Sequence, residues 1–195
     1  MENLTFLNAG FILAAYLLGS FSSAIPLSKI MGFADPRSEG SNNPGATNVM
    51  RIAGKKAAAL TLFGDMLKGF IPVLIASFFL QQTLFIALTG LAAFLGHCYP
   101  LYYQFKGGKG VATAIGFILA FNWVSGLIVV TIWLIIAKVF KLSSLAALIA
   151  FTCLPFIYYA LQNDMNISVL LLIVTFVMTY RHKENIRRII KGEEA

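Results

Sequence analysis

The sequence predicts an all-α integral membrane protein with seven transmembrane helices. Of its 195 residues, 58% are hydrophobic and only 12% are charged, and the mean hydropathy is +0.80. A chain of this composition lacks the polar surface of a soluble domain. Apolar stretches recur along nearly the whole length, and about 20 apolar residues suffice to cross a bilayer. We therefore expect a single polytopic membrane domain over residues 1–195.

The apolar stretches, taken in chain order, define the expected spans. They cover residues 6–26, 57–80, 84–101, 111–121, 123–140, 144–161 and 166–182. The first stretch has no basic segment before it and no small-residue cleavage site, which indicates a retained span rather than a signal peptide. The fourth is open to two interpretations, because residues 111–137 contain no charge and are interrupted only at Asn122. They form either one long helix or a tight hairpin.

The distribution of Lys and Arg favours the hairpin. With seven spans, the N-terminus and the connections at 81–83, 122 and 162–166 share one side and carry no Lys or Arg. The basic residues then gather on the other side, which the positive-inside rule makes cytoplasmic. We therefore expect the N-terminus outside and the C-terminus in the cytoplasm. The fourth span is short, at about 16 Å for eleven residues, so it must be tilted, extended or sheltered.

A polar loop over residues 28–56 contains the first group of candidate functional residues. Asn43 followed by Pro44 is typical of a helix start, with Asn as the N-cap and Pro at the first helical position. Backbone N–H groups at such a start attract anions, and Arg51 can bind phosphate or carboxylate oxygens through two parallel hydrogen bonds. The alternative is a capped loop without a ligand, because turn residues are common in any loop.

The second group is Lys-Gly-Gly-Lys-Gly at residues 106–110, directly before the fourth span. Glycines and a lysine ahead of a helix can cradle a phosphate. This is not a Walker A loop, which ends in Gly-Lys-Ser/Thr, because Gly110 follows Lys109 here. The alternative is a flexible hinge with lysines in the headgroup region.

The third group lies in the basic C-terminal segment. His182 and Asn185 are three residues apart on the helix expected there and would share a face. The Lys and Arg residues of this segment, taken singly, indicate a cytoplasmic anchor on anionic lipid. Among the remaining ionisable residues, Asp65 and Lys68 in the second span are spaced to pair, and His97 at the end of the third is typical of a packing histidine.

The side-chain inventory limits the chemistry. It offers no carboxylate pair, no Ser-His-Asp arrangement and no His/Cys metal cluster, so we expect neither a metal nor a cofactor. The net charge of +7 lies beside the spans, which favours anionic lipids or phosphorylated metabolites over nucleic acid as partners. Many donors and cations with few bases suit catalysis by proximity and electrostatic stabilisation.

Three motifs carry a resemblance that covers essentially the full chain. They are Gly40-Ser41-x-Asn43-Pro44-Gly45-Ala46-Thr47-Asn48-Val49-x-Arg51, then His97-x2-Pro100-x4-Phe105-x-Gly107-Gly108-Lys109-Gly110-Val111-Ala112-Thr113, then Arg181-His182-x2-Asn185-Ile186-x2-Arg188 with Gly192-Glu193. In order and spacing they resemble the motifs of the bacterial acyl-phosphate-dependent glycerol-3-phosphate acyltransferases. Asn42 departs from the pattern, because Gly is most often expected there.

The resemblance implies transfer of a fatty acyl group from acyl phosphate to the sn-1 hydroxyl of glycerol 3-phosphate, giving lysophosphatidic acid and phosphate. It also implies a location in the bacterial cytoplasmic (inner) membrane, with the active site facing the cytoplasm and in contact with membrane lipids. The substrate- and phosphate-binding residues it implies are Gly40, Ser41, Asn43, Gly45, Ala46, Thr47, Asn48, Arg51, His97, Gly107, Gly108, Lys109 and Gly110.

The same resemblance assigns catalytic roles to Ser41, Arg51, Lys109, His182 and Asn185. Lys109 would stabilise the carbonyl oxygen, His182 and Asn185 would position glycerol 3-phosphate, and Glu193 would hold the tail, with Asp65 and Lys68 as a structural pair. A substrate phosphate oxygen would take the hydroxyl proton, so no protein base is required. The competing class is a non-catalytic phosphate or lipid translocator. Acyl-chain preference and oligomeric state stay open, and a monomer is compatible with the sequence.

Overall fold

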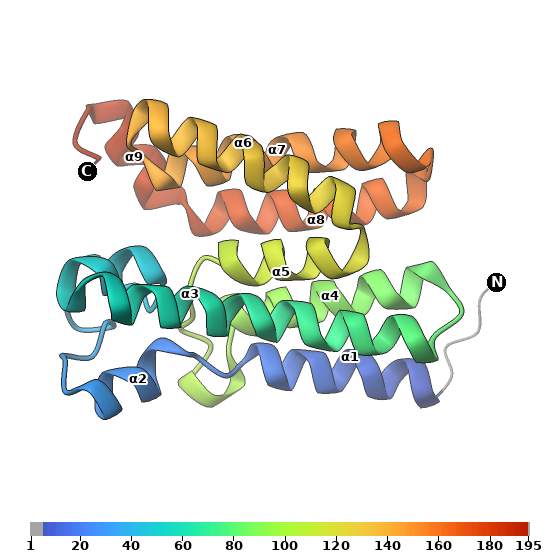
Figure 1. The fold of residues 1–195 in the computed structure, drawn as a ribbon, viewed down its shortest axis with the longest axis horizontal. Coiled ribbons are helices and arrows are strands. Elements are labelled where there is room, and N and C mark those ends of the chain that lie inside the picture. Colours follow the sequence, from blue (N-terminus) through green and yellow to red (C-terminus); the bar gives the residue numbers. More distant parts are fainter. Residues whose placement is uncertain (1–5, 195) are drawn as a thin grey trace. The chain divides into compact units, whose positions relative to one another are not determined.

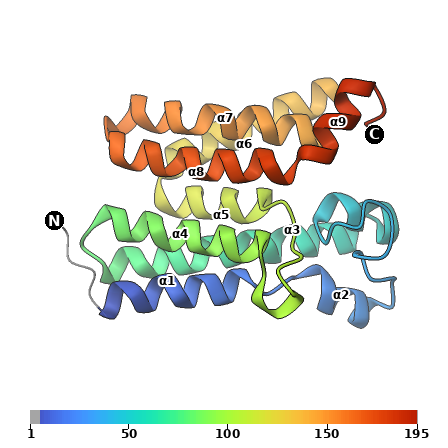
Figure 2. The same cartoon turned by 180° about the vertical axis from the view of Figure 1, so that it is seen from behind.

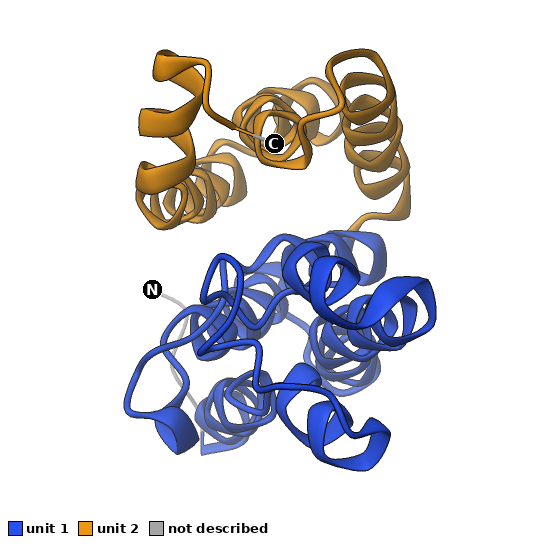
Figure 3. Ribbon diagram, turned by 90° about the vertical axis from the view of Figure 1, so that its left-hand side faces the viewer, with its two compact units in different colours: residues 1–121 blue, residues 122–195 orange. Residues whose placement is uncertain are grey.

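The computed structural model describes residues 6–194, and within them the secondary structure is entirely helical, as expected (Figure 1). The chain divides into two compact units, residues 1–121 and residues 122–195 (Figure 3). The helices of the first unit are α1 (Phe6–Gly19), α2 (Ala24–Met31), α3 (Ala46–Phe79), α4 (Thr83–Cys98), the 3-10 helix η1 (Leu101–Tyr103) and α5 (Val111–Phe121). Those of the second are α6 (Trp123–Phe140), α7 (Ser143–Gln162), α8 (Met165–Arg181) and α9 (Lys183–Lys191).

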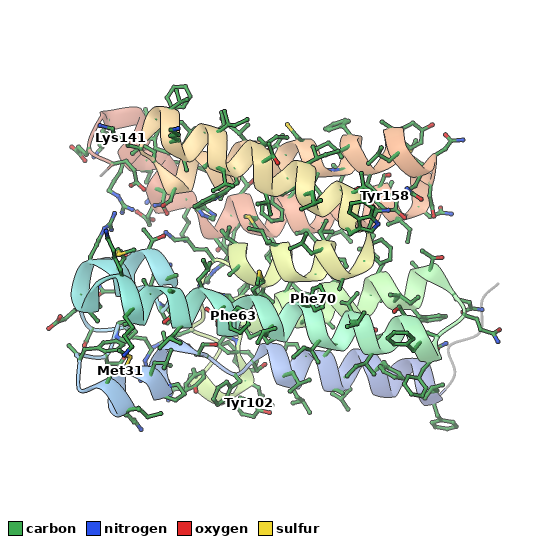
Figure 4. The ribbon with its side chains drawn as sticks, in the orientation of Figure 1. Met31, Phe63, Phe70, Tyr102, Lys141 and Tyr158 are labelled. Atoms are coloured by element: carbon green, nitrogen blue, oxygen red, sulfur yellow. The ribbon has the colours of Figure 1, made fainter. Side chains whose placement is uncertain are left out.

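Membrane-spanning segments account for most of the described chain. Five are long and apolar enough to cross a bilayer: Phe6–Met31, Ala46–Phe79, Thr83–Tyr103, Trp123–Phe140 and Ser143–Gln162. The bent pair α8 and α9 makes a sixth if it is counted as one span, while α5 is shorter. These segments indicate an integral membrane protein. The expected total of seven spans stays a prediction, because it counts the shorter helix α5 as a span. Large apolar side chains such as Phe63, which is 56% exposed, point away from the first unit, as lipid contact requires (Figure 4).

Small residues allow the helices of the first unit to approach closely. A Cβ on Gly19 of α1 would lie 2.1 Å from the carbonyl oxygen of Ala93 in α4. Gly69 of α3 likewise lies against α5, where a Cβ would be 2.0 Å from the carbonyl oxygen of Thr113. Lipid competes equally well for apolar side chains, so close backbone contact of this kind is a main source of helix association in membranes.

Two breaks in the helices differ from the expected spans. The first expected span, residues 6–26, is interrupted between Gly19 and Ala24, and helix α2 then continues to Met31. The loop expected over residues 28–56 is also partly helical, since α3 begins at Ala46. Within α3, Gly54 has φ 78° and ψ −173°, which are not helical angles. Glycine adopts positive φ without a Cβ penalty. About two turns of helix, from Ala46 to the kink at Gly54, therefore precede the span that was predicted from residue 57.

One end of the first unit gathers its polar connections. Helix α2, the loop that leads into α3, and the connection from η1 to α5 lie at the same end in both opposed views (Figures 1 and 2). The C-terminal ends of α1 and α4 reach this end too. The fold therefore brings together segments that are far apart in sequence and contain the first two motifs.

The second unit is built from α6, α7 and α8, with α9 after them. The break expected at Asn122 is present: its side chain caps α6 by accepting a hydrogen bond from the Ser125 backbone N–H at 2.9 Å. Residues 111–137 are therefore two helices and not one. Asp164 caps α8 in the same way through Ile167 at 3.1 Å, and Thr175 of α8 donates to the Phe151 carbonyl of α7 at 2.7 Å.

Candidate functional site

The first-motif loop is held by one buried asparagine. Asn48, in the first turn of α3, is 1% exposed. Its Nδ2 donates to the carbonyl oxygens of Pro36 and Glu39, each at 2.9 Å, and its Oδ1 accepts from the Ser41 backbone N–H at 2.9 Å. Both amide N–H donors are thus used within the loop. We call this arrangement the Asn48 clasp, and it shapes the loop from which the other motif residues project.

The start of α3 differs from the predicted one. The N-cap is Gly45, in an extended conformation with φ −103° and ψ 159°, and helix begins at Ala46. The expectation that Asn43 caps this helix and Pro44 occupies its first position is wrong. Because α3 begins at Ala46, Asn48 lies in its first turn. From there the Asn48 side-chain amide reaches back to the loop. Asn43 instead lies beside the cap, with Nδ2 3.1 Å from where a Cβ on Gly45 would be.

Two residues of this loop have positive φ. Gly40 has φ 62°, and a Cβ there would lie 2.3 Å from Oδ1 of Asn48. Asn42 has φ 54°, which explains why Gly is the residue expected there, since Asn is one of the few others that tolerate this conformation. Ser41, Thr47 and Arg51 are exposed. The loop therefore presents polar and basic groups to solvent while its amide anchor is buried.

The second motif folds back onto the end of α4. The Gly108 backbone N–H donates to the His97 carbonyl at 3.1 Å. A Cβ on Gly107 would lie 2.1 Å from the same carbonyl oxygen, and one on Gly108 would lie 2.2 Å from the His97 ring nitrogen Nε2. Side chains are excluded at both positions by these contacts. Lys109, half-buried, and Gly110, with φ 84°, then lead into α5 at Val111, as predicted.

A pocket opens where these segments meet. It is lined by Gly19, Ser20, Phe21, Ser22, Ile25, Pro44, Lys68, His97, Pro100, Tyr103, Lys106, Gly107 and Gly108. The first and second motifs both contribute, through Pro44 and through the glycines. The Arg37 guanidinium, over the Tyr103 ring at 5.6 Å from its centroid, joins the same two segments. Apolar and aromatic side chains form much of the lining, and Lys68 and Lys106 add positive charge that would attract an anion.

Lys68, one of the expected pair of charges in α3, lines the pocket, and its partner Asp65 lies behind it. Lys68 Nζ lies 3.0 Å from Asp65 Oδ1, and their side chains are 8% and 3% exposed. Lys68 also donates to the Phe21 carbonyl at 2.6 Å. His97 Nδ1 is 3.9 Å from the same carboxylate oxygen, to which the Ser23 backbone N–H donates at 3.4 Å.

The third motif lies in the second unit, and its two named residues stand on either side of a bend. His182 is not within a helix: it ends α8 and caps α9, and the two helices are bent by 59°. His182 therefore lies at the junction of two helices rather than inside one, while Asn185 lies in the first turn of α9, and both are buried. His182 is 2% exposed, and its Nδ1 lies 2.8 Å from the Met178 carbonyl. That contact fixes the orientation of the imidazole.

A carboxylate holds the chain after the third motif. Glu194 Oε1 accepts from Ser144 Oγ at 2.7 Å and from Asn185 Nδ2, and Oε2 lies 2.6 Å from Arg188 Nε. Burial by itself raises the pKa of this carboxyl, but the hydrogen bonds from Asn185, Ser144 and Arg188 outweigh it and hold the pKa below its ordinary value. We call this arrangement the Glu194 clasp. Glu193, expected to hold the tail, donates its backbone N–H to Arg188.

Comparison with known proteins identifies the family. The family model described as glycerol-3-phosphate acyltransferase matches residues 9–192. The chain belongs to the glycerol-3-phosphate acyltransferase family. A glycerol-3-phosphate acyltransferase of Methylococcus capsulatus is 50% identical over 93% of this chain and 91% of its own length. One from Ruthia magnifica is 46% identical over 94% and 93%.

Solved structures agree with this membership. The crystal structure of PlsY (YgiH), an integral membrane glycerol 3-phosphate acyltransferase, in its glycerol 3-phosphate form has a TM-score of 0.90 to this chain at 39% identity. The match covers 97% of this chain and 94% of that one. The lysophosphatidic acid form has a TM-score of 0.86 at 38% identity. A role in phospholipid biosynthesis fits this family.

The structure brings some of the predicted site residues together and adds others. Within the first unit, Pro44 of the first motif and His97, Gly107 and Gly108 of the second line one pocket. The linker Gly19–Ser22, which also lines it, was missed, because small residues at the end of an apolar span carry no signal of their own. Lys68 was detectable as a charge in an apolar helix. Within residues 6–194, no group of three or more His, Cys, Asp or Glu side chains could hold a metal ion.

Proposed function

We propose that this protein transfers a fatty acyl group from acyl phosphate to the sn-1 hydroxyl of glycerol 3-phosphate. The products are 1-acyl-glycerol 3-phosphate, which is lysophosphatidic acid, and inorganic phosphate. The observation that carries the proposal is the family match over residues 9–192, which includes the three motifs up to Gly192. Two related structures in glycerol 3-phosphate and lysophosphatidic acid forms are consistent with this acceptor and this product.

The proposed reaction needs binding and charge stabilisation more than a protein base. The glycerol hydroxyl oxygen attacks the carbonyl carbon, the bond from that carbon to the phosphate oxygen breaks, and phosphate leaves with the bonding electrons. The hydroxyl proton passes to a phosphate oxygen. Acyl phosphate is a mixed anhydride with a good leaving group, so the protein can act through proximity and electrostatics.

The first two motifs offer matching groups for these tasks. We assign phosphate binding to three exposed side chains of the first motif: Ser41, in the loop that the Asn48 clasp holds, and Thr47 and Arg51, in the first turns of α3. Lys109, at the end of the glycine segment, would stabilise the negative charge that develops on the carbonyl oxygen. His182 and Asn185 would position glycerol 3-phosphate. Both are buried and held by hydrogen bonds, as positioning groups require.

The donor is tested with purified protein in detergent. Acyl phosphate with glycerol 3-phosphate should give lysophosphatidic acid and phosphate in equal amounts, whereas acyl coenzyme A under the same conditions should give neither. Lys109→Met should reduce turnover by about two orders of magnitude if it removes one oxyanion-stabilising donor, and Lys138→Met, in the last turn of α6, serves as the matched control. Equal use of acyl coenzyme A would overturn the proposed donor.

The proposed location is the bacterial cytoplasmic membrane, with seven spans, the N-terminus outside and the first two motifs facing the cytoplasm. The charge distribution supports this topology, and so does the separation of α5 from α6 at Asn122. Single cysteines at positions 38 and 122, in a background where Cys98 and Cys153 are replaced by Ser, provide the test. In intact cells, a membrane-impermeant thiol reagent should label position 122 and not position 38. The reverse pattern would contradict the topology.

A further inference from the structure

The buried Asp65–Lys68 pair has no role in the reaction as described so far, yet it stands at the pocket. Lys68 lines the pocket together with His97, Gly107 and Gly108. Its side chain is 8% exposed and its ammonium has two hydrogen-bond partners in the described chain, Asp65 Oδ1 at 3.0 Å and the Phe21 carbonyl at 2.6 Å. An ammonium group has three N–H donors. The third is therefore available to a ligand in the pocket.

Stability alone is a poor reason for such a pair. Removing two charges from water costs several kcal/mol per ion, and replacing a buried pair by apolar residues is often neutral or stabilising. In a membrane span the ordinary solution would be a pair of apolar residues, and ionisable residues there are functional by default. Asp65 compensates the Lys68 charge when no anion is bound, so the protein can keep a cation inside an otherwise apolar region.

Asp65 also joins the segments that form the pocket wall. Its carboxylate accepts from the Ser23 backbone N–H, on the linker after α1, and lies 3.9 Å from Nδ1 of His97 at the end of α4. Its own carbonyl accepts from Thr113 Oγ1 in α5 at 2.9 Å. Three segments outside α3 thus meet at this one residue of α3. A shift of this carboxylate would move the Lys68 ammonium relative to the Gly107–Gly108 backbone.

We propose that Lys68 binds a phosphoryl oxygen of a substrate and that Asp65 is the positioning residue that holds the Lys68 ammonium at the pocket wall. This inference rests on the proposed function for its substrates, since acyl phosphate and glycerol 3-phosphate both carry a phosphoryl group. The shared chemistry is a charge-assisted N–H···O bond to that group. Separate KM values for the two substrates show which one Lys68 contacts.

The first part of the test compares Lys68→Met with Lys68→Arg. Loss of one charge-assisted hydrogen bond weakens binding by about 10- to 100-fold, so Lys68→Met should raise KM for one of the two substrates by that factor. Lys68→Arg keeps the charge and should recover part of the loss. Glu184→Gln is the matched control, because Glu184 and Arg187 have the same three-residue spacing but are exposed. It should change neither KM.

The second part separates positioning from mere charge balance. Asp65→Asn and Lys68→Met each leave one buried charge without its counter-ion and should each lower the unfolding temperature, whereas the double variant should restore it. The double variant should nevertheless keep the high KM of Lys68→Met. If the double variant recovers the KM of the unsubstituted protein together with its stability, the pair is only structural and the proposal is overturned.

A measurement without turnover keeps this inference distinct from the proposed function. Inorganic phosphate should raise the unfolding temperature of the unsubstituted protein, because a ligand that binds only the folded state stabilises it. The double variant, with restored stability, should lose this response. If the unsubstituted protein fails to use acyl phosphate, the proposed function fails. If the double variant responds to phosphate as the unsubstituted protein does, the Lys68 inference fails whatever the outcome of the activity assay.

Discussion

The two clasps solve the same structural problem with opposite chemistry. The Asn48 clasp holds the first-motif loop with a neutral amide that donates twice and accepts once. The Glu194 clasp holds the C-terminal tail with a carboxylate that only accepts, from Ser144, Asn185 and Arg188. Each side chain anchors a polar segment next to a motif of the acyltransferase family. The bonding partners determine which side chain can anchor each clasp. Backbone carbonyls require a hydrogen-bond donor, and an arginine requires an anion.

This difference predicts different sensitivities. A neutral amide does not titrate, so the first-motif loop should keep its shape wherever the rest of the first unit is folded. A carboxylate loses its charge in acid, and its hydrogen bonds to Arg188 and Asn185 weaken with it. Isosteric exchange between amide and acid, applied to each clasp, therefore tests the comparison with almost no change in side-chain volume.

The largest effect is expected for Asn48→Asp. The substitution places carboxylate oxygens against the carbonyls of Pro36 and Glu39, where Nδ2 now donates. Two acceptors lose their donor, and the buried carboxylate keeps only the Ser41 backbone N–H as a partner, which costs on the order of 3 kcal/mol or more. Hydrogen exchange over residues 36–48, followed by mass spectrometry, should show faster opening of the loop, with loss of acyl transfer. Unchanged exchange there would contradict the assignment of Asn48 as the anchor.

A smaller effect is expected for the Glu194 clasp in acid. The folded-state pKa of Glu194 lies below its ordinary value of 4.5, so its contribution to stability is complete above that value. The contribution falls as the pH drops through the folded pKa, because the unfolded state then binds the proton more readily. Exchange over residues 183–194, corrected for the intrinsic pH dependence of exchange, should therefore accelerate in this range.

Glu194→Gln provides the control for that measurement. Glutamine can still accept from Ser144 but gives up the charged bond to Arg188, which costs about 1.5–3 kcal/mol. In this variant, residues 183–194 should exchange faster at neutral pH. Their exchange should show no additional acceleration as the pH is lowered. Glu193→Gln, at the neighbouring position, should leave both unchanged because only its backbone N–H is used. An acid step that persists in Glu194→Gln would assign the titration to another group.

The same two regions show how far the sequence could predict the structure. The long apolar helices were predicted because lipid as solvent demands such segments. Asn122 left residues 111–137 open to two interpretations, and the distribution of Lys and Arg favoured the break that the structure shows. The N-cap at Gly45 was not found. Asn43–Pro44 is the stronger local signal for a helix start. The observed start at Ala46 instead accompanies the hydrogen bonds of Asn48 to residues seven to twelve positions away, which local propensity does not contain.

The tail illustrates a second limit. Glu193 and Glu194 are identical in type, and only the backbone decides which side chain turns inward. Gly192 has φ 71°, and the Glu193 N–H then bonds to the Arg188 carbonyl, which directs Glu194 toward Ser144 and Asn185. The sequence motifs thus drew attention to these segments, while hydrogen bonds that local propensity does not contain decide how each segment is held.

The smallest effect is expected at an exposed ion pair in the same loop as Asn48. Asp35 accepts from Arg37 at 2.6 Å, and that hydrogen bond lowers the pKa of Asp35, but the two side chains are 35% and 41% exposed. Pairs of this exposure contribute less than about 1 kcal/mol, and salt screens them. Asp35→Asn should therefore leave the unfolding temperature and the loop exchange nearly unchanged. An effect as large as that of Asn48→Asp, at low salt or high, would show that charge rather than the buried amide holds this loop.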